Sequence, residues 1–198
     1  MGFELVQGVS AENCDKIHSA FYADEYGISA TLSAELYFGV ITALIEKLSE
    51  PVFFFLEIPC SDDEEKSLRK GKNAPFHYNV YYLDNCTASV AKAIMSRYGE
   101  LLINDGLCRF GFGSHKNDEE IYCMKYQVVS VYGDVKKFKR AFEKLDILEE
   151  MGFKTLWDTF TNDTPGTCSA VEINGETVYD IVSNLKSEGL YLSDIVEE

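Results

Sequence analysis

Apolar residues recur every three or four positions in several stretches of the chain, which is the spacing of a helix that buries one face. The clearest stretch is 33–50, which Pro51 follows directly. The stretches with this spacing, and hence the predicted helices, are 10–22, 33–50, 87–104, 134–145 and 176–189. The residues placed to cap these helices are Ser10, Ser33 and Asp134, and a further helix begins from Thr87.

Other stretches have the patterns of strands. "VFFFLEIP" is a continuous apolar run of strand length, as expected for a strand covered on both faces. "FHYNVYYLD" alternates instead, with Tyr78, Val80 and Tyr82 on one face. The strands predicted for the centre of a sheet are 52–59, 76–84, 107–113 and 121–132. Shorter strands are predicted at 3–9, 153–161 and 169–173, and an exposed polar loop at 60–75.

These elements predict an α+β fold with a mainly antiparallel central sheet packed with helices, because the strands and helices do not alternate regularly. A chain of 198 residues is long enough for one substantial core. We therefore expect residues 1–198 to form a single domain, with 149–198 as a candidate C-terminal appendage.

The stretch "LCRFGFGSHKNDEEIYCMKY" raises a choice between a phosphate-binding loop and a β-hairpin. A phosphate loop needs a different glycine spacing and a helix after it, whereas a strand pattern follows this turn. The acids just after the turn would also repel phosphate. Arg109, Gly111 and Gly113 share one face of the first strand, where glycines allow close packing. We predict an antiparallel hairpin that turns between His115 and Asp118.

Charge is the most distinctive feature of the composition. The chain has 33 acidic and 18 basic side chains, for a net charge of −15. Nucleic acids and anionic membranes would be repelled, so neither is expected as a partner. No apolar run reaches the ~20 residues that span a bilayer. The first residues lack the basic and apolar regions of a secretory signal, so a cytoplasmic protein is the simplest interpretation.

The six cysteines are spread along the chain without a Cys-x-x-Cys pair, and the three histidines do not cluster with them. We therefore expect reduced thiols, no bound metal and no cofactor. Cys60 precedes a run of acids, which should raise the pKa of its thiol and make it a poor nucleophile. No Ser-His-Asp order, nucleophile elbow or pair of catalytic carboxylates stands out, so the sequence does not predict an enzyme.

The segment from "FHYNVYYLDN" through "GLCRFGFGSHKNDEEIYC", taken with the acidic clusters, carries a family resemblance. The chain resembles the immunity proteins of bacterial polymorphic or contact-dependent toxin systems. Those proteins are small, acidic and diverse in fold, and they bind and block a cognate toxin domain, often a nuclease. The resemblance implies a protein-binding role, and it transfers no site residues because that class has no shared motif.

Two functions of different classes follow. In the first, the chain neutralises a basic partner, a cognate toxin, by occluding it with acidic and aromatic side chains. The candidates for partner contact are Asp62, Asp63, Glu64, Glu65, Asp118, Glu119, Glu120 and Tyr122. In the second, the chain is a small-molecule enzyme or ligand-binding domain that uses Arg109, His77, Tyr81 and His115 near the glycine-bearing sheet face. The basic helix face at 136–144 is either a solvated surface or, in a homodimer, a site for acidic segments of a second copy.

Overall fold

A computed structural model of the protein describes residues 2–198. Within this range, five α-helices and eleven strands form an α+β fold, as the sequence pattern predicts. The helices are α1 (Ala34–Ile45), α2 (Asp62–Leu68), α3 (Ala88–Asn104), α4 (Val135–Glu143) and α5 (Val178–Leu185). The strands are β1 (Val9–Ser10), β2 (Ala20–Ala23), β3 (Ile28–Thr31), β4 (Val52–Pro59), β5 (His77–Cys86), β6 (Arg109–Ser114), β7 (Glu119–Met124), β8 (Val128–Tyr132), β9 (Leu148–Glu149), β10 (Thr167–Cys168) and β11 (Tyr191–Glu197). Short 3₁₀ helices cover Cys14–Lys16, Lys125–Gln127, Leu156–Thr159 and Lys186–Glu188.

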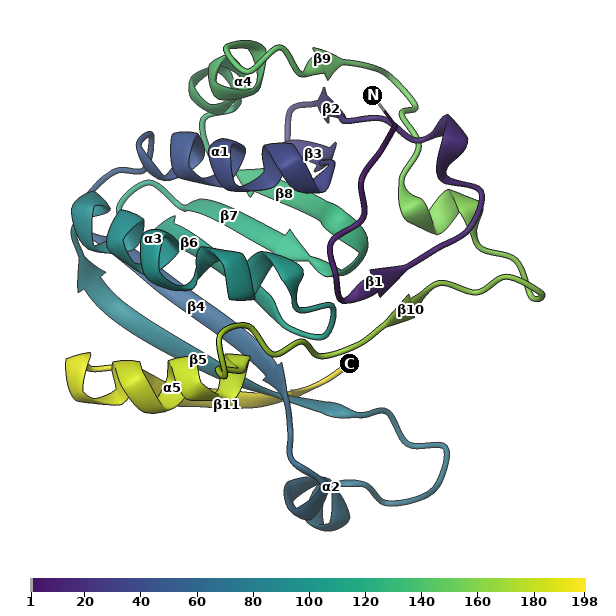
Figure 1. Cartoon of the computed structure of the whole chain (residues 1–198). Helices are drawn as coiled ribbons and strands as arrows, with labels where there is room; N and C mark the ends of the chain where they lie inside the picture. Colours follow the sequence, from purple (N-terminus) through teal and green to yellow (C-terminus); the bar gives the residue numbers. More distant parts are fainter. Residues whose placement is uncertain (1) are drawn as a thin grey trace.

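Nine of the strands form one central sheet in the order β11-β5-β4-β6-β7-β8-β3-β2-β9 (Figure 1). All neighbours in this sheet are antiparallel except β2 and β9, which run parallel. The predicted strands at 52–59, 76–84 and 107–113 correspond to β4, β5 and β6. These three lie side by side, so the prediction of a mainly antiparallel central sheet is confirmed.

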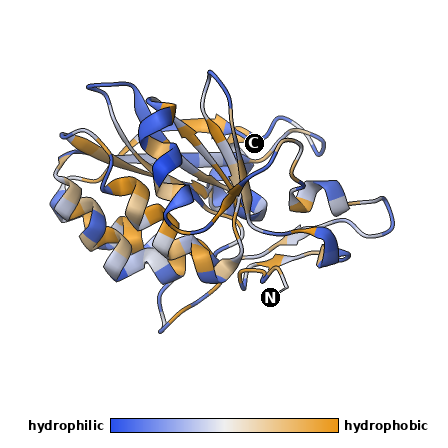
Figure 2. Ribbon diagram, turned by 90° about the horizontal axis from the view of Figure 1, so that it is seen from above, coloured by the Kyte–Doolittle hydropathy of each residue, from blue (hydrophilic) through white to orange (hydrophobic). Residues whose placement is uncertain are grey.

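The longer helices α1, α3, α4 and α5 pack against the same face of the sheet. Their side chains, among them Leu44, Met95, Phe142 and Ile181, join Phe54 of β4 in one buried cluster. In the view from above, the central strands are largely hydrophobic, whereas the helices carry hydrophobic and hydrophilic residues in alternation (Figure 2). The other face of the sheet carries no α-helix in the described part of the chain. We call it the open face.

Of the three predicted caps Asp134 is confirmed, whereas Ser10 lies in strand β1 and begins no helix. The Thr87 hydroxyl accepts a hydrogen bond from the Val90 N–H at the start of α3, and the Asp134 carboxylate accepts one from the Lys137 N–H at the start of α4. Ser33 precedes α1, but its hydroxyl accepts the N–H of Glu4 at 2.8 Å instead. That contact ties the N-terminal segment to the first long helix.

The predicted hairpin is confirmed. Strands β6 and β7 pair antiparallel, from Phe110 opposite Cys123 to Ser114 opposite Glu119, with the turn between them. The prediction of one strand over 121–132 is wrong. Tyr126 and Gln127 have positive φ angles of 58° and 59°, so the chain reverses there and β8 returns beside β7.

Several shorter predictions are also wrong. The stretch 10–22 contains a 3₁₀ helix and the strand β2 instead of a helix, and 153–161 forms a 3₁₀ helix instead of a strand. Of the strand predicted at 3–9, only Val9 lies in a strand, as the first residue of β1. The predicted loop at 60–75 contains α2, because Ser61 and Glu64 form a capping box that starts a helix.

Residues beyond 149 contribute to the main hydrophobic core and to a second, smaller hydrophobic cluster. Strand β11 pairs with β5, and Val178 and Leu185 of α5 are buried in the main cluster. Strand β10 pairs with β1 in a separate two-stranded ribbon. Gly106 allows that ribbon to approach α3, because a Cβ at this position would lie 2.0 Å from the Gly8 carbonyl oxygen. None of the helices within residues 2–198 is long and apolar enough to cross a bilayer.

Candidate protein-binding face

A row of directly opposed residues crosses the open face through eight neighbouring strands. Its members are Tyr22, Ser29, Ser130, Tyr122, Gly111, Phe55, Tyr82 and Tyr191. The register places a large aromatic ring at both ends and in the middle, with serines and a glycine between. Eight strands are about 34 Å wide at the usual strand spacing. The row therefore crosses a broad surface on which Tyr22, Tyr82 and Tyr122 are half-buried and Tyr191 is exposed.

The middle of the open face is an aromatic cluster built on glycines. A Cβ on Gly111 would lie 2.4 Å from the ring of Phe55, and a Cβ on Gly113 would lie 2.3 Å from the ring of Phe53. Both rings therefore lie flat on the strand beside them, and Phe55 is only 3% exposed. Tyr82 and Tyr122 flank Phe55, with ring centroids 5.8 and 5.4 Å from it.

A carboxylate and a guanidinium lie beside these rings. The Tyr122 hydroxyl donates a hydrogen bond to Glu57 Oε2 at 2.9 Å. Arg109 Nε lies 2.6 Å from the same oxygen, which is close enough for an ion pair, but its N–H direction does not form a hydrogen bond. The guanidinium also lies over the Tyr78 ring, 4.3 Å from its centroid. The charges of Glu57 and Arg109 therefore offset each other.

Glu120 is different, because it has no cationic partner within residues 2–198. Its carboxylate is half-buried on the open face, where Glu120 lies opposite Gly113 of β6 and Tyr132 of β8. Burial and the nearby Glu57 carboxylate raise its pKa, and His115 only partly opposes the shift. A half-buried carboxylate without a counter-ion is a site that a cation from another molecule would stabilise.

A shallow groove lies on the open face beside Glu120. It has a volume of about 140 Å³ and is lined mainly by aromatic rings, small residues and one carboxylate, from Tyr22, Asp24, Tyr26, Gly27, Ile28, Ser29, Ser130 and Tyr132. Tyr26 is 77% exposed and Tyr132 is 46% exposed. Tyrosine faces beside a carboxylate favour a lysine or arginine side chain, through cation–π contact and charge.

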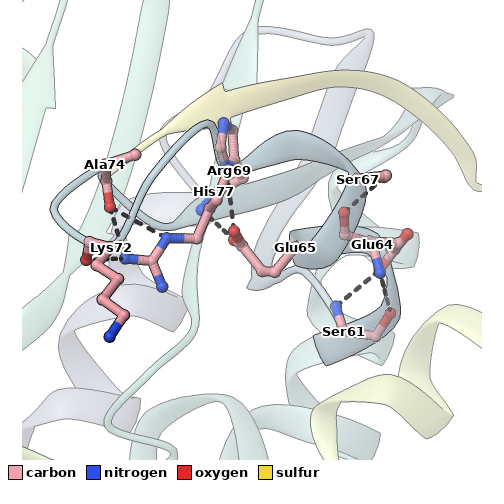
Figure 3. Close-up of polar contacts among 8 residues, drawn as sticks. All are labelled: Ser61, Glu64, Glu65, Ser67, Arg69, Lys72, Ala74 and His77. Carbon is pink, nitrogen blue, oxygen red and sulfur yellow. Dashed lines mark hydrogen bonds and ion pairs between the residues drawn. The ribbon is translucent and has the colours of Figure 1, made fainter.

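The acidic cluster at 62–65 lies on α2, beyond the end of β4, and half of it is used within the fold (Figure 3). Glu64 closes the capping box with Ser61, and hydrogen bonds from Ser61 lower its pKa. Glu65 is buried and contacts His77, whose Nδ1 lies 3.2 Å from Glu65 Oε2. Asp62 and Asp63 remain exposed.

The second acidic cluster, residues 118–120, lies at the other end of β4, because Phe53 pairs with Gly113 next to the β6–β7 turn. The two clusters are thus roughly 25 Å apart, given the length of strand per residue. Within the second cluster Asp118 is exposed in the turn, whereas Glu119 is 2% exposed and paired with Lys137. The structure therefore does not bring the two clusters together, and only Glu120 and Tyr122 of the predicted residues face the open surface.

The four residues of the alternative ligand site are also divided. Arg109 lies on the open face, and the His115 ring stacks on Phe53 there with centroids 4.5 Å apart. His77 and Tyr81 point to the opposite face, since the alternation along β5 places them with Leu83 of the main core. The structure therefore does not assemble this set into one site.

Sequence reasoning missed most of the tyrosine row. Tyr82 of the row and Tyr132 of the groove occupy alternating strand positions, which was a usable signal. Tyr22 was hidden because the stretch 10–22 predicts a helix, and Tyr191 because the sequence predicts no strand at β11. Burial, followed by the charges of Glu64 and Glu65, raises the pKa of the Cys60 thiol to about 11, in the predicted direction. No group of three metal-binding side chains lies together within residues 2–198.

Comparison with protein-family models, with curated proteins and with solved structures finds no match to this chain. Function therefore has to be inferred from the chain's own side chains.

Acid should destabilise the fold through Glu119. Burial opposes ionisation of this carboxyl, but hydrogen bonds and charge from Lys137 and the Ser49 N–H outweigh burial and lower its pKa. The stabilisation that ionised Glu119 provides is complete above the ordinary Glu pKa of about 4.3. It is lost as the pH falls through the lower pKa that Glu119 has in the folded protein. Glu119→Gln should lower the free energy of unfolding by about 1–3 kcal/mol at pH 7, and this loss should shrink below pH 4.

Urea unfolding of the wild type and of Glu119→Gln at several pH values measures this effect. Glu25→Gln is the control, because Glu25 is exposed and has no cationic partner in the described range. Equal pH profiles for the two variants would contradict the assignment.

Proposed function

We propose that the chain is an immunity-type binding protein, which neutralises a cognate basic toxin domain by occluding it with the open face. The observation that carries the proposal is Glu120, a half-buried carboxylate with no cationic partner among residues 2–198, set in a surface of exposed and half-exposed tyrosines. Tyrosine is enriched at the centres of protein interfaces. A cytoplasmic location, where such a protein meets an incoming toxin, fits this role.

The dimensions of the open face support a protein partner. A surface about 34 Å wide can provide the ~800 Å² that each partner buries in a typical stable interface. Ser29 and Ser130, between the tyrosines, line a shallow groove that has room for a side chain of the partner. A partner would therefore gain contact area without a rearrangement of the sheet.

The charge of the chain supports a basic partner. A net charge of −15 attracts a cationic surface at long range and raises the association rate. Next to Glu120, the groove lined by Tyr22, Tyr26 and Tyr132 adds a short-range contact for one lysine or arginine. Long-range attraction and the aromatic contacts thus act at different steps of binding.

The small-molecule alternative has less support. Its four residues are divided between the two faces of the sheet, and the Arg109 guanidinium is occupied by Glu57 and Tyr78. Turnover of a metabolite by the purified protein would restore that alternative.

The proposal is tested by producing the chain together with the product of the adjacent gene and purifying it by a tag. A complex that contains a basic protein, and loss of that protein's toxicity in cells that make the chain, would support the proposal. If the product of the adjacent gene neither binds the chain nor is neutralised by it, the proposal is refuted for that gene product.

Charge reversal on the open face should act mainly on the association rate. Glu120→Lys should slow association of the basic partner about tenfold at low salt and weaken its salt dependence, because the reversed charge opposes electrostatic steering. Asp62→Lys is the matched control, since it changes the net charge equally at the other end of β4. Binding kinetics at two salt concentrations measure both variants. A larger effect of Asp62→Lys would place the interface at α2 instead.

A further inference from the structure

A basic cleft lies between the end of α1 and the outer side of α4. Its volume is about 360 Å³, and five cations and one carboxylate line it: Lys47, Asp134, Lys136, Lys137, Arg140 and Lys144. These five cations are a large share of the 18 basic residues in a chain that has 33 acidic ones. Positive charge is therefore concentrated in this cleft, although the molecule as a whole is acidic.

The sequence of α4 explains how the cations reach one side. Phe138, Ala141 and Phe142 are buried against the sheet and fix the orientation of the helix. At about 100° per residue, positions 136, 137, 140 and 144 then fall on one outer sector. Lys47, just beyond α1, faces them across the cleft.

Most of these cations lack a counter-ion within residues 2–198. In the described part of the chain, only Lys137 of the five has a carboxylate within 4.0 Å, namely Glu119. Asp134 lines the cleft, but its carboxylate accepts the backbone N–H of Lys137 as the helix cap. The remaining cations repel one another, and an anion between them would remove that repulsion.

We propose that this cleft binds a compact anion that carries several phosphate groups. Its lining provides a guanidinium, which can bind phosphate oxygens in a bidentate way, and three ammonium groups besides the paired Lys137, which act as point charges. No aromatic ring lines the cleft to stack on a nucleobase, so the phosphates themselves are the recognised feature. The site is separate from the open face, and it does not depend on the proposed function.

Inorganic tripolyphosphate is the probe, titrated into the full chain by calorimetry and in thermal melts, with sodium chloride added to hold ionic strength constant. Saturable binding and a rise in melting temperature are expected, because a ligand of the folded state stabilises it. Arg140→Gln should weaken binding about tenfold. Lys139→Gln is the matched control: it removes one positive charge from the same helix, but Lys139 lies outside the cleft and pairs with Glu149 and Glu143. It should change binding less than twofold.

Three results would overturn the proposal. The first is no heat and no stabilisation beyond sodium chloride of equal ionic strength. The second is an equal loss of binding in Arg140→Gln and Lys139→Gln. The third is self-association in sedimentation experiments that Arg140→Gln abolishes and tripolyphosphate does not affect. That outcome would assign the cleft to acidic segments of a second copy.

Discussion

Replacing Tyr122 by alanine should weaken binding of the basic partner by about 2–3 kcal/mol, or roughly 30- to 150-fold. Tyr122 lies in the middle of the row on the open face, its ring packs beside Phe55, and its hydroxyl holds Glu57. A desolvated aromatic at the centre of an interface acts mainly after the encounter, so the loss should appear as faster dissociation. Binding kinetics measured at one salt concentration separate the two rates.

Phe38→Ala is the control for this prediction. Phe38 is 45% exposed on α1, on the helical side of the sheet, so its removal should leave the affinity unchanged. Tyr122→Phe keeps the ring and should lose only a small part of the affinity. Thermal melts of each variant show whether the fold is intact. A folded Tyr122→Ala protein that binds as tightly as the wild type would exclude the open face as the interface.

Gly111→Ala should lower the free energy of unfolding by about 3 kcal/mol. A Cβ at this position would lie 2.2 Å from the backbone oxygen of Ile121 and 2.4 Å from the Phe55 ring, so strand β7 and the aromatic cluster would both have to move. Because the Phe55 ring between Tyr82 and Tyr122 packs on Gly111, the variant should also bind the partner more weakly even where it remains folded.

Gly39→Ala provides the matched comparison in a urea titration. Gly39 lies in α1 and is exposed, and a Cβ added at this position would meet no neighbouring group within 4 Å. The change should therefore stabilise the protein by about 0.5–1 kcal/mol, because alanine favours the helix. Similar effects of the two substitutions would contradict the close packing at Gly111.

The elements that the sequence predicts well are those in which local pattern and tertiary position agree. Strand β4 is a continuous apolar run in the middle of the sheet, and α3 and α4 begin at residues whose side chains cap them. The β6–β7 hairpin was predictable because a polar turn separates two alternating runs.

The failures have local causes. Strands β2 and β3 are four residues each, too short for a periodic signal, and they are held by pairing with each other and with β8. Tyr126 and Gln127 adopt positive φ without a glycine, so nothing in the sequence marks the reversal between β7 and β8. The helix α2 depends on a capping box, and the polar composition of the stretch led to the prediction of a loop instead.

The candidate site was only partly accessible from sequence for the same reason. Glu120 and Tyr122 were identified from an acidic turn and a strand pattern within one hairpin. The other tyrosines of the open face, Tyr22, Tyr82 and Tyr132, come from strands that the order of the sheet brings to one face. Charge alone could not separate Glu120, which lacks a counter-ion within residues 2–198, from Glu119, which is buried against Lys137.

The most direct test of the open face as the binding surface is carbodiimide labelling of carboxylates, read by mass spectrometry with and without the bound partner. If the open face is the interface, labelling of Glu120 should fall several-fold in the complex, while labelling of Asp62 and Asp63 on α2 should stay unchanged. Protection of Asp62 and Asp63 with unchanged labelling of Glu120 would contradict the account.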